Sequence, residues 1–148
     1  MSLTSSLFRL MNMANRQAVV FWEESLRQTG FPGKCLPYLW EICQRPGLSQ
    51  DALAHTLDVN KSSVTRNVGV LEADGYVERR ASEVDRRVIF LYPTDRAYEI
   101  LPRLLEAVND WQATLTRGMS PEEVELLSEL AEHLTANLEA LPDREDNL

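Results

Sequence analysis

The chain has 148 residues, of which 44% are hydrophobic and 26% charged, and its formal net charge is −8. These values are typical of a folded domain with a real core and exclude a wholly disordered chain. No apolar run approaches the roughly 20 residues of a membrane-spanning helix, and the first residues lack the apolar core and cleavage site of a signal peptide. We therefore expect a cytoplasmic protein.

The positive charge is concentrated in the middle third of the chain. Positions 60–92 hold six basic and five acidic residues, a net charge of +1, so the rest of the chain carries −9. Cys35 and Cys43 fall in one predicted helix about 12 Å apart, too far for a mutual disulfide. His55 and His133 are far apart and neither pairs closely with a cysteine, so zinc-ligand spacing is absent. We expect no metal and no cofactor.

Helical periodicity begins near the N-terminus. Apolar residues recur there at three- and four-residue spacing and predict an amphipathic helix that ends near Gly30; they are Leu7, Leu10, Met11, Ala14, Ala18 and Phe21. The FPGK sequence that follows is a break. A short second helix is predicted next, stopped by RPG at 45–47 and marked by Leu36, Leu39, Trp40 and Cys43.

Two further short helices are predicted on either side of a turn at 58–59. Ser49 and Asn60 are the expected N-caps, because their side-chain oxygens can accept from free backbone N–H groups. Gly75 ends the second of these helices as a C-terminal glycine does. The residues expected to face the core are Leu53, Ala54, Leu57, Val64, Val68 and Leu71.

A β-hairpin is predicted after these helices. Two short runs rich in β-branched and aromatic residues, YVERR at 76–80 and VIFLY at 88–92, are separated by the seven residues ASEVDRR. The connection is longer than a tight two-residue turn, so the charged tip can project.

The remainder is predicted to be helical. One helix would begin with Thr94 as its N-cap, contain Pro102 as a kink, and end at Gly118. The last would begin in SPEE, where Ser120 and Glu123 can form a capping box. The outer helices carry more apolar residues than a central unit of roughly 60 residues can cover, which predicts a partner, most simply a second copy.

This order of elements predicts a mainly α fold with a small β-hairpin (α+β), in which the central part is a winged helix-turn-helix. In such a unit the start of the second helix enters the major groove of DNA. A solvated polar face is the alternative, but three hydroxyl residues in two turns are unfavourable in a helix unless the face is used. The candidate DNA contacts are Ser49, Lys61, Ser62, Ser63, Thr65, Arg66 and Asn67.

The hairpin tip carries Asp85, Arg86 and Arg87. A charged turn can simply be solvated. At the tip of a wing, however, a guanidinium suits the negative potential of a narrow minor groove, so Arg86 and Arg87 are candidate DNA contacts. Asp85 would orient an arginine through a charge-assisted pair.

The sequence resembles the MarR (multiple antibiotic resistance regulator) family of transcription factors. LSQDALAHTLDVNKSSVTRNVGVLEADGYVERR is similar to the helix-turn-helix and first wing strand of that family, VDRR to its Asp-x-Arg wing tip, and GMSPEEVELLSEL to the start of its last helix. The chain departs from the pattern after the second wing strand, where Leu-Thr-x-x-Gly is replaced by Pro93, Thr94 and Ala97. The context of Cys35 also differs from the N-terminal cysteine of the family's peroxide sensors.

The resemblance implies a homodimer. Residues 1–30 and 94–142 would form a helical dimerisation region, residues 31–93 the winged DNA-binding lobe, and residues 143–148 a tail. Two lobes would bind a pseudo-palindromic operator with their recognition helices about 34 Å apart. Repression is the commoner behaviour in the family.

The resemblance also implies release of DNA when a small phenolic or aromatic effector binds in a crevice between the dimer helices and the lobe. The aromatic residues that would line this crevice are Trp22, Tyr38, Trp40 and Trp111, although each can instead be a core residue. Cys35, near a helix start, could have a lowered pKa and sense oxidants, or be an inert buried thiol.

Two other functional classes are weighed against DNA binding. A winged-helix protein-interaction module would carry an acidic or apolar recognition face, which Lys61, Arg66 and Asn67 contradict. An enzyme would need a catalytic constellation, and the sequence contains no Gly-rich phosphate loop, no GxSxG and no Cys/His pairing. We therefore expect no enzymatic activity.

Overall fold

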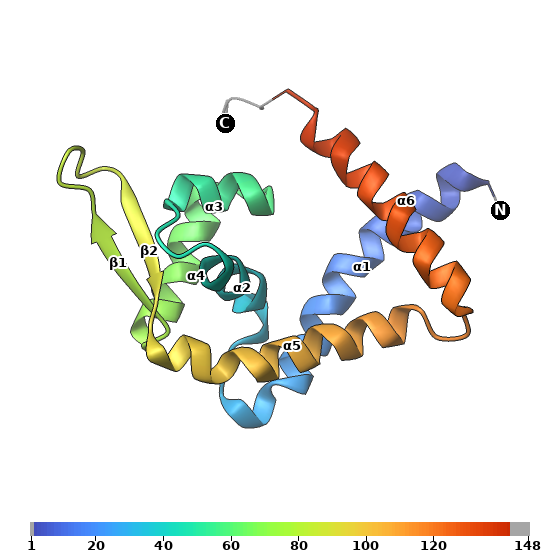
Figure 1. The fold of residues 1–148 in the computed structure, drawn as a ribbon, viewed down its shortest axis with the longest axis horizontal. Helices are drawn as coiled ribbons and strands as arrows, with labels where there is room; N and C mark the ends of the chain where they lie inside the picture. Colours follow the sequence, from blue (N-terminus) through green and yellow to red (C-terminus); the bar gives the residue numbers. More distant parts are fainter. Residues whose placement is uncertain (1, 143–148) are drawn as a thin grey trace. The chain divides into compact units, whose positions relative to one another are not determined.

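The computed structural model describes residues 2–142 (Figure 1). The chain divides into two compact units between Trp111 and Gln112. The elements in chain order are α1 (Leu3–Ser25), the 3₁₀ turns η1 (Arg27–Thr29) and η2 (Gly33–Cys35), α2 (Leu36–Gln44), α3 (Gln50–Leu57), α4 (Lys61–Ala73), β1 (Val77–Ala81), β2 (Ile89–Pro93), α5 (Asp95–Leu115) and α6 (Pro121–Glu139). The predicted α+β class is confirmed: the described chain is mainly helical with one antiparallel hairpin.

The helix starts follow from side-chain caps, as predicted. The Ala52 N–H donates to Ser49 Oγ at 3.0 Å, which starts α3. The Ser63 N–H donates to Asn60 Oδ1 at 2.7 Å, which starts α4. At the start of α6, Ser120 and Glu123 form the expected capping box. Each cap satisfies backbone donors that have no partner inside the helix.

The core of the first unit lies where α2, α3 and α4 meet the hairpin. Val64, Val68 and Leu71 form the buried stripe of α4, and Leu53 and Ala54 the buried side of α3, as the periodicity predicts. Leu57 is only partly buried but packs against the same core. This packing leaves the opposite side of α4 in solvent.

The hairpin lies alongside α3 and α4, with its tip at the end away from the start of α5 (Figure 1). Its strands begin one residue later than the predicted runs at 76–80 and 88–92. The reason is that the Tyr76 N–H donates to the Leu71 carbonyl at 2.9 Å, so Tyr76 closes α4 rather than opening β1. The Leu91 N–H and carbonyl bond to Leu48 and Gly47, which gives β2 a second neighbour.

The hairpin base is tied to α5 through Thr94. The Thr94 hydroxyl donates to the Gly75 carbonyl at 2.6 Å, while its own carbonyl accepts from the Ala97 N–H at 3.0 Å. Thr94 therefore lies directly before the helix, at the predicted N-cap position, and its hydroxyl joins the end of α4 to the start of α5. Helix α5 continues through Pro102.

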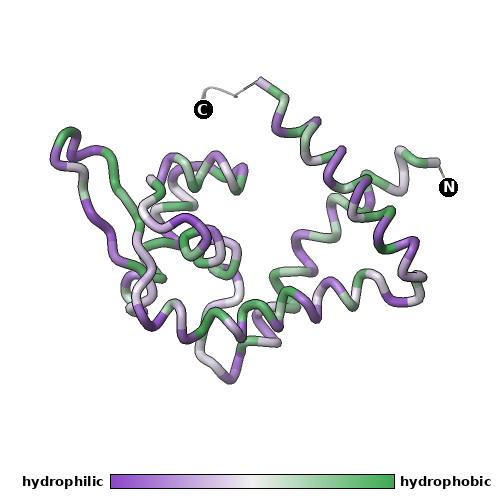
Figure 2. Tube along the Cα trace, viewed as in Figure 1, coloured by the Kyte–Doolittle hydropathy of each residue, from purple (hydrophilic) through white to green (hydrophobic). Residues whose placement is uncertain are grey.

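Helix α6, in the second unit, buries none of its residues. Hydrophobic and hydrophilic positions alternate along it (Figure 2), and the large apolar residues are exposed: Leu126, Leu127, Leu130, Leu134 and Leu138. The first half of α1 likewise exposes Leu3, Phe8, Leu10 and Met11. The predicted tail at 143–148 lies outside the described residues. Along the part of the chain that the structure describes, every helix is too short or too polar to cross a bilayer.

Candidate nucleic-acid interface

The first two turns of α4 present a polar face to solvent. Lys61, Ser62, Thr65 and Arg66 are exposed, because the inward stripe of Val64 and its neighbours fixes the rotation of the helix. These four predicted DNA contacts therefore lie together on one accessible surface, which we call the α4 face.

The side chains of the α4 face make only weak contacts with the rest of the protein. The Thr65 hydroxyl donates to the Lys61 carbonyl at 3.0 Å, and Arg66 Nη2 lies 3.4 Å from Ser63 Oγ. Lys61 Nζ lies 3.4 Å from Asp51 Oδ1 in a pair whose side chains are 64% and 69% exposed. Exposed ion pairs contribute little, so these groups can exchange partners at small cost.

Asn67 was predicted on the solvent side, and the structure places it instead at the edge of the buried stripe. Its Nδ2 donates to the Ser63 carbonyl at 2.9 Å, and its Oδ1 accepts from the Cys35 thiol at 3.6 Å. Position 67 is next to Val68 and one turn from Val64, so it faces η2 rather than open solvent. Both polar groups of the Asn67 side chain therefore have partners within the lobe, unlike the exposed side chains of the α4 face.

Two of the predicted DNA contacts, Ser49 and Ser63, are partly buried and also take part in helix caps. Ser63 is partly buried, and its N–H belongs to the Asn60 cap. Ser49 is also partly buried, and it forms an isolated β-bridge with Phe90. Because the Ser49 oxygen accepts in its cap, the O–H group is the part of this side chain that can meet a phosphate.

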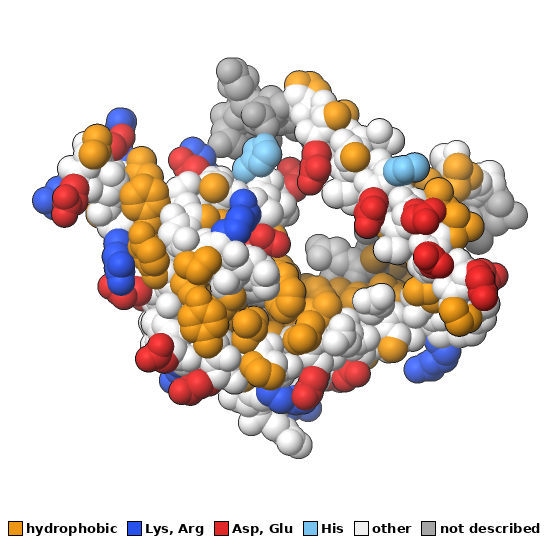
Figure 3. Space-filling model, viewed as in Figure 1, with side chains coloured by type: hydrophobic (Ala, Val, Ile, Leu, Met, Phe, Trp, Pro, Cys, Tyr) orange, Lys and Arg blue, Asp and Glu red, His pale blue; other side chains and the backbone are white. Residues whose placement is uncertain are grey.

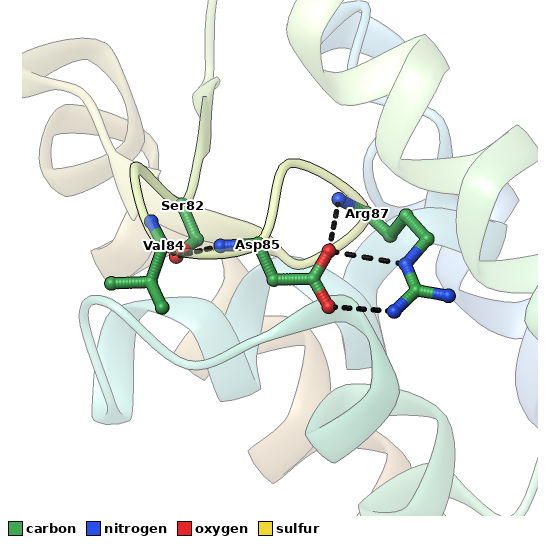
Figure 4. Close-up of polar contacts among 4 residues, drawn as sticks. All are labelled: Ser82, Val84, Asp85 and Arg87. Atoms are coloured by element: carbon green, nitrogen blue, oxygen red, sulfur yellow. Dashed lines mark hydrogen bonds and ion pairs between the residues drawn. The ribbon is translucent and has the colours of Figure 1, made fainter.

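The wing tip is organised around Asp85 (Figure 4). Its carboxylate accepts from Arg87 Nε and Nη2, each at 3.1 Å, and from the Arg87 backbone N–H at 3.0 Å. The Ser82 hydroxyl oxygen accepts from the Val84 and Asp85 N–H groups, which fixes the turn before it. Asp85 is therefore paired with Arg87, while the Arg87 side chain stays 91% exposed.

The charge states at the tip follow from this pairing. Hydrogen bonding to Arg87 lowers the pKa of the Asp85 carboxyl, and the same pair raises the pKa of the Arg87 guanidinium. Both groups are therefore charged at neutral pH. Arg86 is exposed and has no ion pair or hydrogen bond within the described chain, so its guanidinium is free for an outside partner.

A groove separates the wing tip from the starts of α3 and α4. It has a volume of about 470 Å³ and is lined by Gln50, Asp51, Lys61, Val64, Thr65, Asp85, Arg87 and Val88. Basic and acidic side chains also gather at the projecting end of the hairpin (Figure 3). The groove thus carries charges of both signs, with a basic group on each wall.

Two arginines of β1 were not among the predicted contacts. Arg79 Nη2 donates to the Thr65 carbonyl of α4 at 2.7 Å. Arg80 lies over the Tyr92 ring, 4.2 Å from its centroid, and pairs with Glu78. Successive side chains of a strand point to opposite faces, so Arg79 faces the lobe and Arg80 faces away from it. This period was the signal in the sequence that distinguishes the two arginines.

Of the two alternatives for Cys35, the structure favours the buried thiol over one with a lowered pKa. Burial raises the pKa of the Cys35 thiol to about 11, more than the nearby Lys34 lowers it, and burial also raises that of Cys43 to about 11. Both cysteines are free and buried. Loss of water around the thiol outweighs any effect of the helix start.

The four aromatic residues of the predicted crevice have different surroundings. Tyr38 is a core residue, only 8% exposed, so the single chain does not present it to a ligand. Trp22 packs against the core, and the Trp111 ring lies 5.3 Å from that of Phe21. Trp40, on α2, is partly exposed.

Comparison with known proteins agrees with this geometry. A model of the MarR family matches residues 29–88, the span from the end of η1 to the end of the wing loop. A crystal structure of MarR superposes with a TM-score of 0.83 at 27% identity, covering 91% of this chain and 98% of MarR. The chain is thus similar to the MarR family in its central lobe and to MarR itself over nearly its whole length.

Other proteins similar to this chain are also transcriptional regulators. The uncharacterized HTH-type transcriptional regulator YybA of Bacillus subtilis is 26% identical over 102 residues, which cover 69% of this chain and 68% of YybA. A putative transcriptional regulatory protein for the hcr operon of Thauera aromatica is 42% identical over 67 residues, 45% of this chain and 40% of its own length. These relatives are regulators and not enzymes, in agreement with the expectation that this chain has no enzymatic activity.

The fold also matches a putative MarR-family regulator from Listeria monocytogenes that was crystallised with 26mer DNA. The TM-score is 0.79 at 17% identity, covering 89% of this chain and 88% of the Listeria protein. At that identity the likeness concerns the fold.

Proposed function

We propose that this protein is a MarR-family transcriptional regulator that binds double-stranded DNA in a sequence-specific manner, with the α4 face in the major groove and the wing tip in the adjacent minor groove. The observation that carries the proposal is the α4 face itself, with Lys61 and Arg66 exposed beside the projecting Arg86 and Arg87. Arg66 can bind guanine at two acceptors, whereas the wing arginines suit a narrow groove. The Listeria protein, which has a similar fold, was crystallised with 26mer DNA, and this supports DNA binding by the present chain.

The proposal includes a homodimer. Residues 1–30 and 94–142 would form its dimerisation region, residues 31–93 its winged lobe, and a pseudo-palindromic operator its target. The support is the exposed leucine row of α6, which buries nothing within the described chain, together with the exposed apolar start of α1. An amphipathic helix without a covered face is poorly stabilised in water, and a second copy offers the matching surface.

A dimer also accounts for DNA binding by an acidic chain. The net charge is −8, yet positions 60–92 carry a net +1. Charges interact across about 8 to 10 Å at physiological salt, so the local arginines govern the potential near the DNA. A lobe with so small an excess of positive charge binds DNA weakly on its own. Two linked lobes that bind the same DNA together have a higher affinity.

We propose, from the family resemblance, that the protein is a ligand-responsive repressor. It would release DNA on binding a small aromatic or phenolic effector. We also propose that it is cytoplasmic. The partly exposed rings of Trp22, Trp40 and Trp111 support a site for such a molecule. Titration of the protein–operator complex with substituted benzoates and phenols tests this part separately.

Selection of bound sequences from a random duplex pool tests the main proposal. The expected result is one enriched pseudo-palindrome whose half-sites are about one helical turn apart. Weak binding to every duplex at low salt, without enrichment, would contradict it and favour the protein-interaction module instead.

A further inference from the structure

Arg79 lies on the side of the hairpin that faces the lobe. In the strand register it is opposite Leu91, which is fully buried, and it is two residues from the buried Val77. Residues directly opposite each other in an antiparallel pair share a face. A guanidinium therefore stands at a position where the strand pattern would place an apolar side chain.

The Arg79 guanidinium reaches the backbone of α4. Its Nη2 donates to the Thr65 carbonyl at 2.7 Å, while its Nε is shielded from solvent and has no hydrogen-bond partner within the described chain. Gly69, one turn after Thr65, makes room for this contact, because a Cβ at that position would lie 3.3 Å from Nη2. A charged donor in a partly desolvated place makes a stronger hydrogen bond than an exposed one.

We propose that Arg79 is a positioning residue that fixes the wing relative to α4, so that the α4 face and Arg87 engage DNA together. The inference rests on the proposed DNA-binding function and adds a residue to it. Thr65 contributes its carbonyl to this bond and its exposed side chain to the α4 face, so the bond joins β1 to the part of the helix that reads DNA. A wing tied at this point has fewer orientations to lose on binding.

Arg80 is a matched control, because it carries the same charge at the next position on the opposite face of the strand. It is exposed and bonds to Glu78 rather than to α4. Arg79→Met and Arg80→Met remove the same net charge and keep an unbranched apolar stem. We expect Arg79→Met to weaken binding to the selected operator about tenfold and Arg80→Met at most about twofold. Equal losses would overturn the proposal.

Gly69→Leu tests the same bond without removing any charge. Leucine favours a helix more than glycine does, so a weaker helix would not explain an effect. Its side chain fills the space that the guanidinium uses, and we expect a severalfold loss of operator affinity. Wild-type operator affinity in Gly69→Leu would contradict the positioning role. This variant also serves as the second test if Arg79→Met does not fold.

A double-mutant cycle separates positioning from direct phosphate contact. If Arg79 acts through the wing, Arg79→Met should cost less than about twofold once Arg87→Ala has already removed the wing contact. If Arg79 contacts phosphate itself, the two losses multiply, and the proposal is overturned.

The mobility of the wing can be measured without DNA. We expect ¹⁵N relaxation to show larger motion of the Arg87 and Val88 amides in Arg79→Met than in Arg80→Met. Unchanged motion would overturn the positioning role whether or not the protein binds DNA. Increased motion in a protein whose wild type binds no duplex would support the positioning role and contradict only the proposed function.

Discussion

The Arg87 guanidinium meets both carboxylate oxygens of Asp85, each at 3.1 Å, at the tip of a seven-residue loop between β1 and β2. The pair holds an exposed arginine in one orientation before any partner arrives. Two carboxylates line the same groove as Arg87, and they have different roles: Asp85 orders the wing, whereas Asp51 only faces Lys61.

Asp85→Ala should weaken DNA binding although it makes the protein less acidic. The variant loses the pair with Arg87 and the acceptor of the Arg87 backbone N–H, so the arginine is no longer pre-oriented. We expect a three- to tenfold loss of operator affinity, on the order of 1 kcal/mol, in fluorescence anisotropy titrations. An affinity that rises because the negative charge is lost would contradict this role.

Asp51→Asn should have the opposite effect. Its carboxylate contacts Lys61 in an exposed pair and contributes no order to the wing. Removing it frees Lys61 for phosphate and takes one negative charge from the groove, so we expect about two- to threefold tighter binding to specific and random duplexes alike. The measurement is the same titration on both kinds of duplex, and a loss confined to the operator would argue against it.

Arg66 and Arg87 should differ in what they contribute. Arg66→Ala should cost about 1 to 3 kcal/mol on the operator and relax one position of each half-site, because the side chain reads a base. Arg87→Ala should weaken binding to all sequences and flatten the dependence of affinity on salt. An unchanged salt slope for Arg87→Ala would remove the wing from the interface.

The cysteines should react slowly in the folded protein. At a pKa of about 11, against the ordinary value of 9.0, the thiolate fraction at pH 8 is about a hundredfold lower than in the unfolded chain. Iodoacetamide labelling at pH 8 with and without denaturant measures the difference. Fast labelling of native Cys35 would restore it as a candidate oxidant sensor.

The same shift affects stability at high pH. The folded state favours the protonated thiols, so their contribution is complete below about pH 9 and is lost as the pH rises toward 11. Urea unfolding of wild type and of Cys43→Ser between pH 8 and 11 measures this. Wild type should lose stability faster over that range.

Local patterns in the sequence were sufficient to predict the helix caps and the buried stripe of α4. Ser49, Asn60 and Ser120 cap helices because the required partners lie within three residues of each, and Val64, Val68 and Leu71 repeat with the period of a helix. Because the buried stripe fixes the rotation of α4, the exposure of Lys61 and Arg66 could be predicted from it.

The remaining features depend on neighbours that are distant in sequence. Asn67 lies at the edge of the stripe, where its Oδ1 accepts from the thiol of Cys35, 32 positions earlier in the chain. The burial that raises the pKa of Cys35 is likewise a property of the packed lobe. Arg79 could be assigned to the side of the hairpin that faces the lobe only once the hairpin register was known. Its partner is the backbone carbonyl of Thr65, and a backbone carbonyl cannot be identified as a partner from the residue types.

Sequence selection with wild type and Arg66→Ala in parallel would show whether the α4 face reads DNA. We expect one pseudo-palindrome for wild type, and for Arg66→Ala the same palindrome with preference lost at one symmetric pair of positions. An identical base preference in the two proteins, or no preference in wild type, would contradict this expectation.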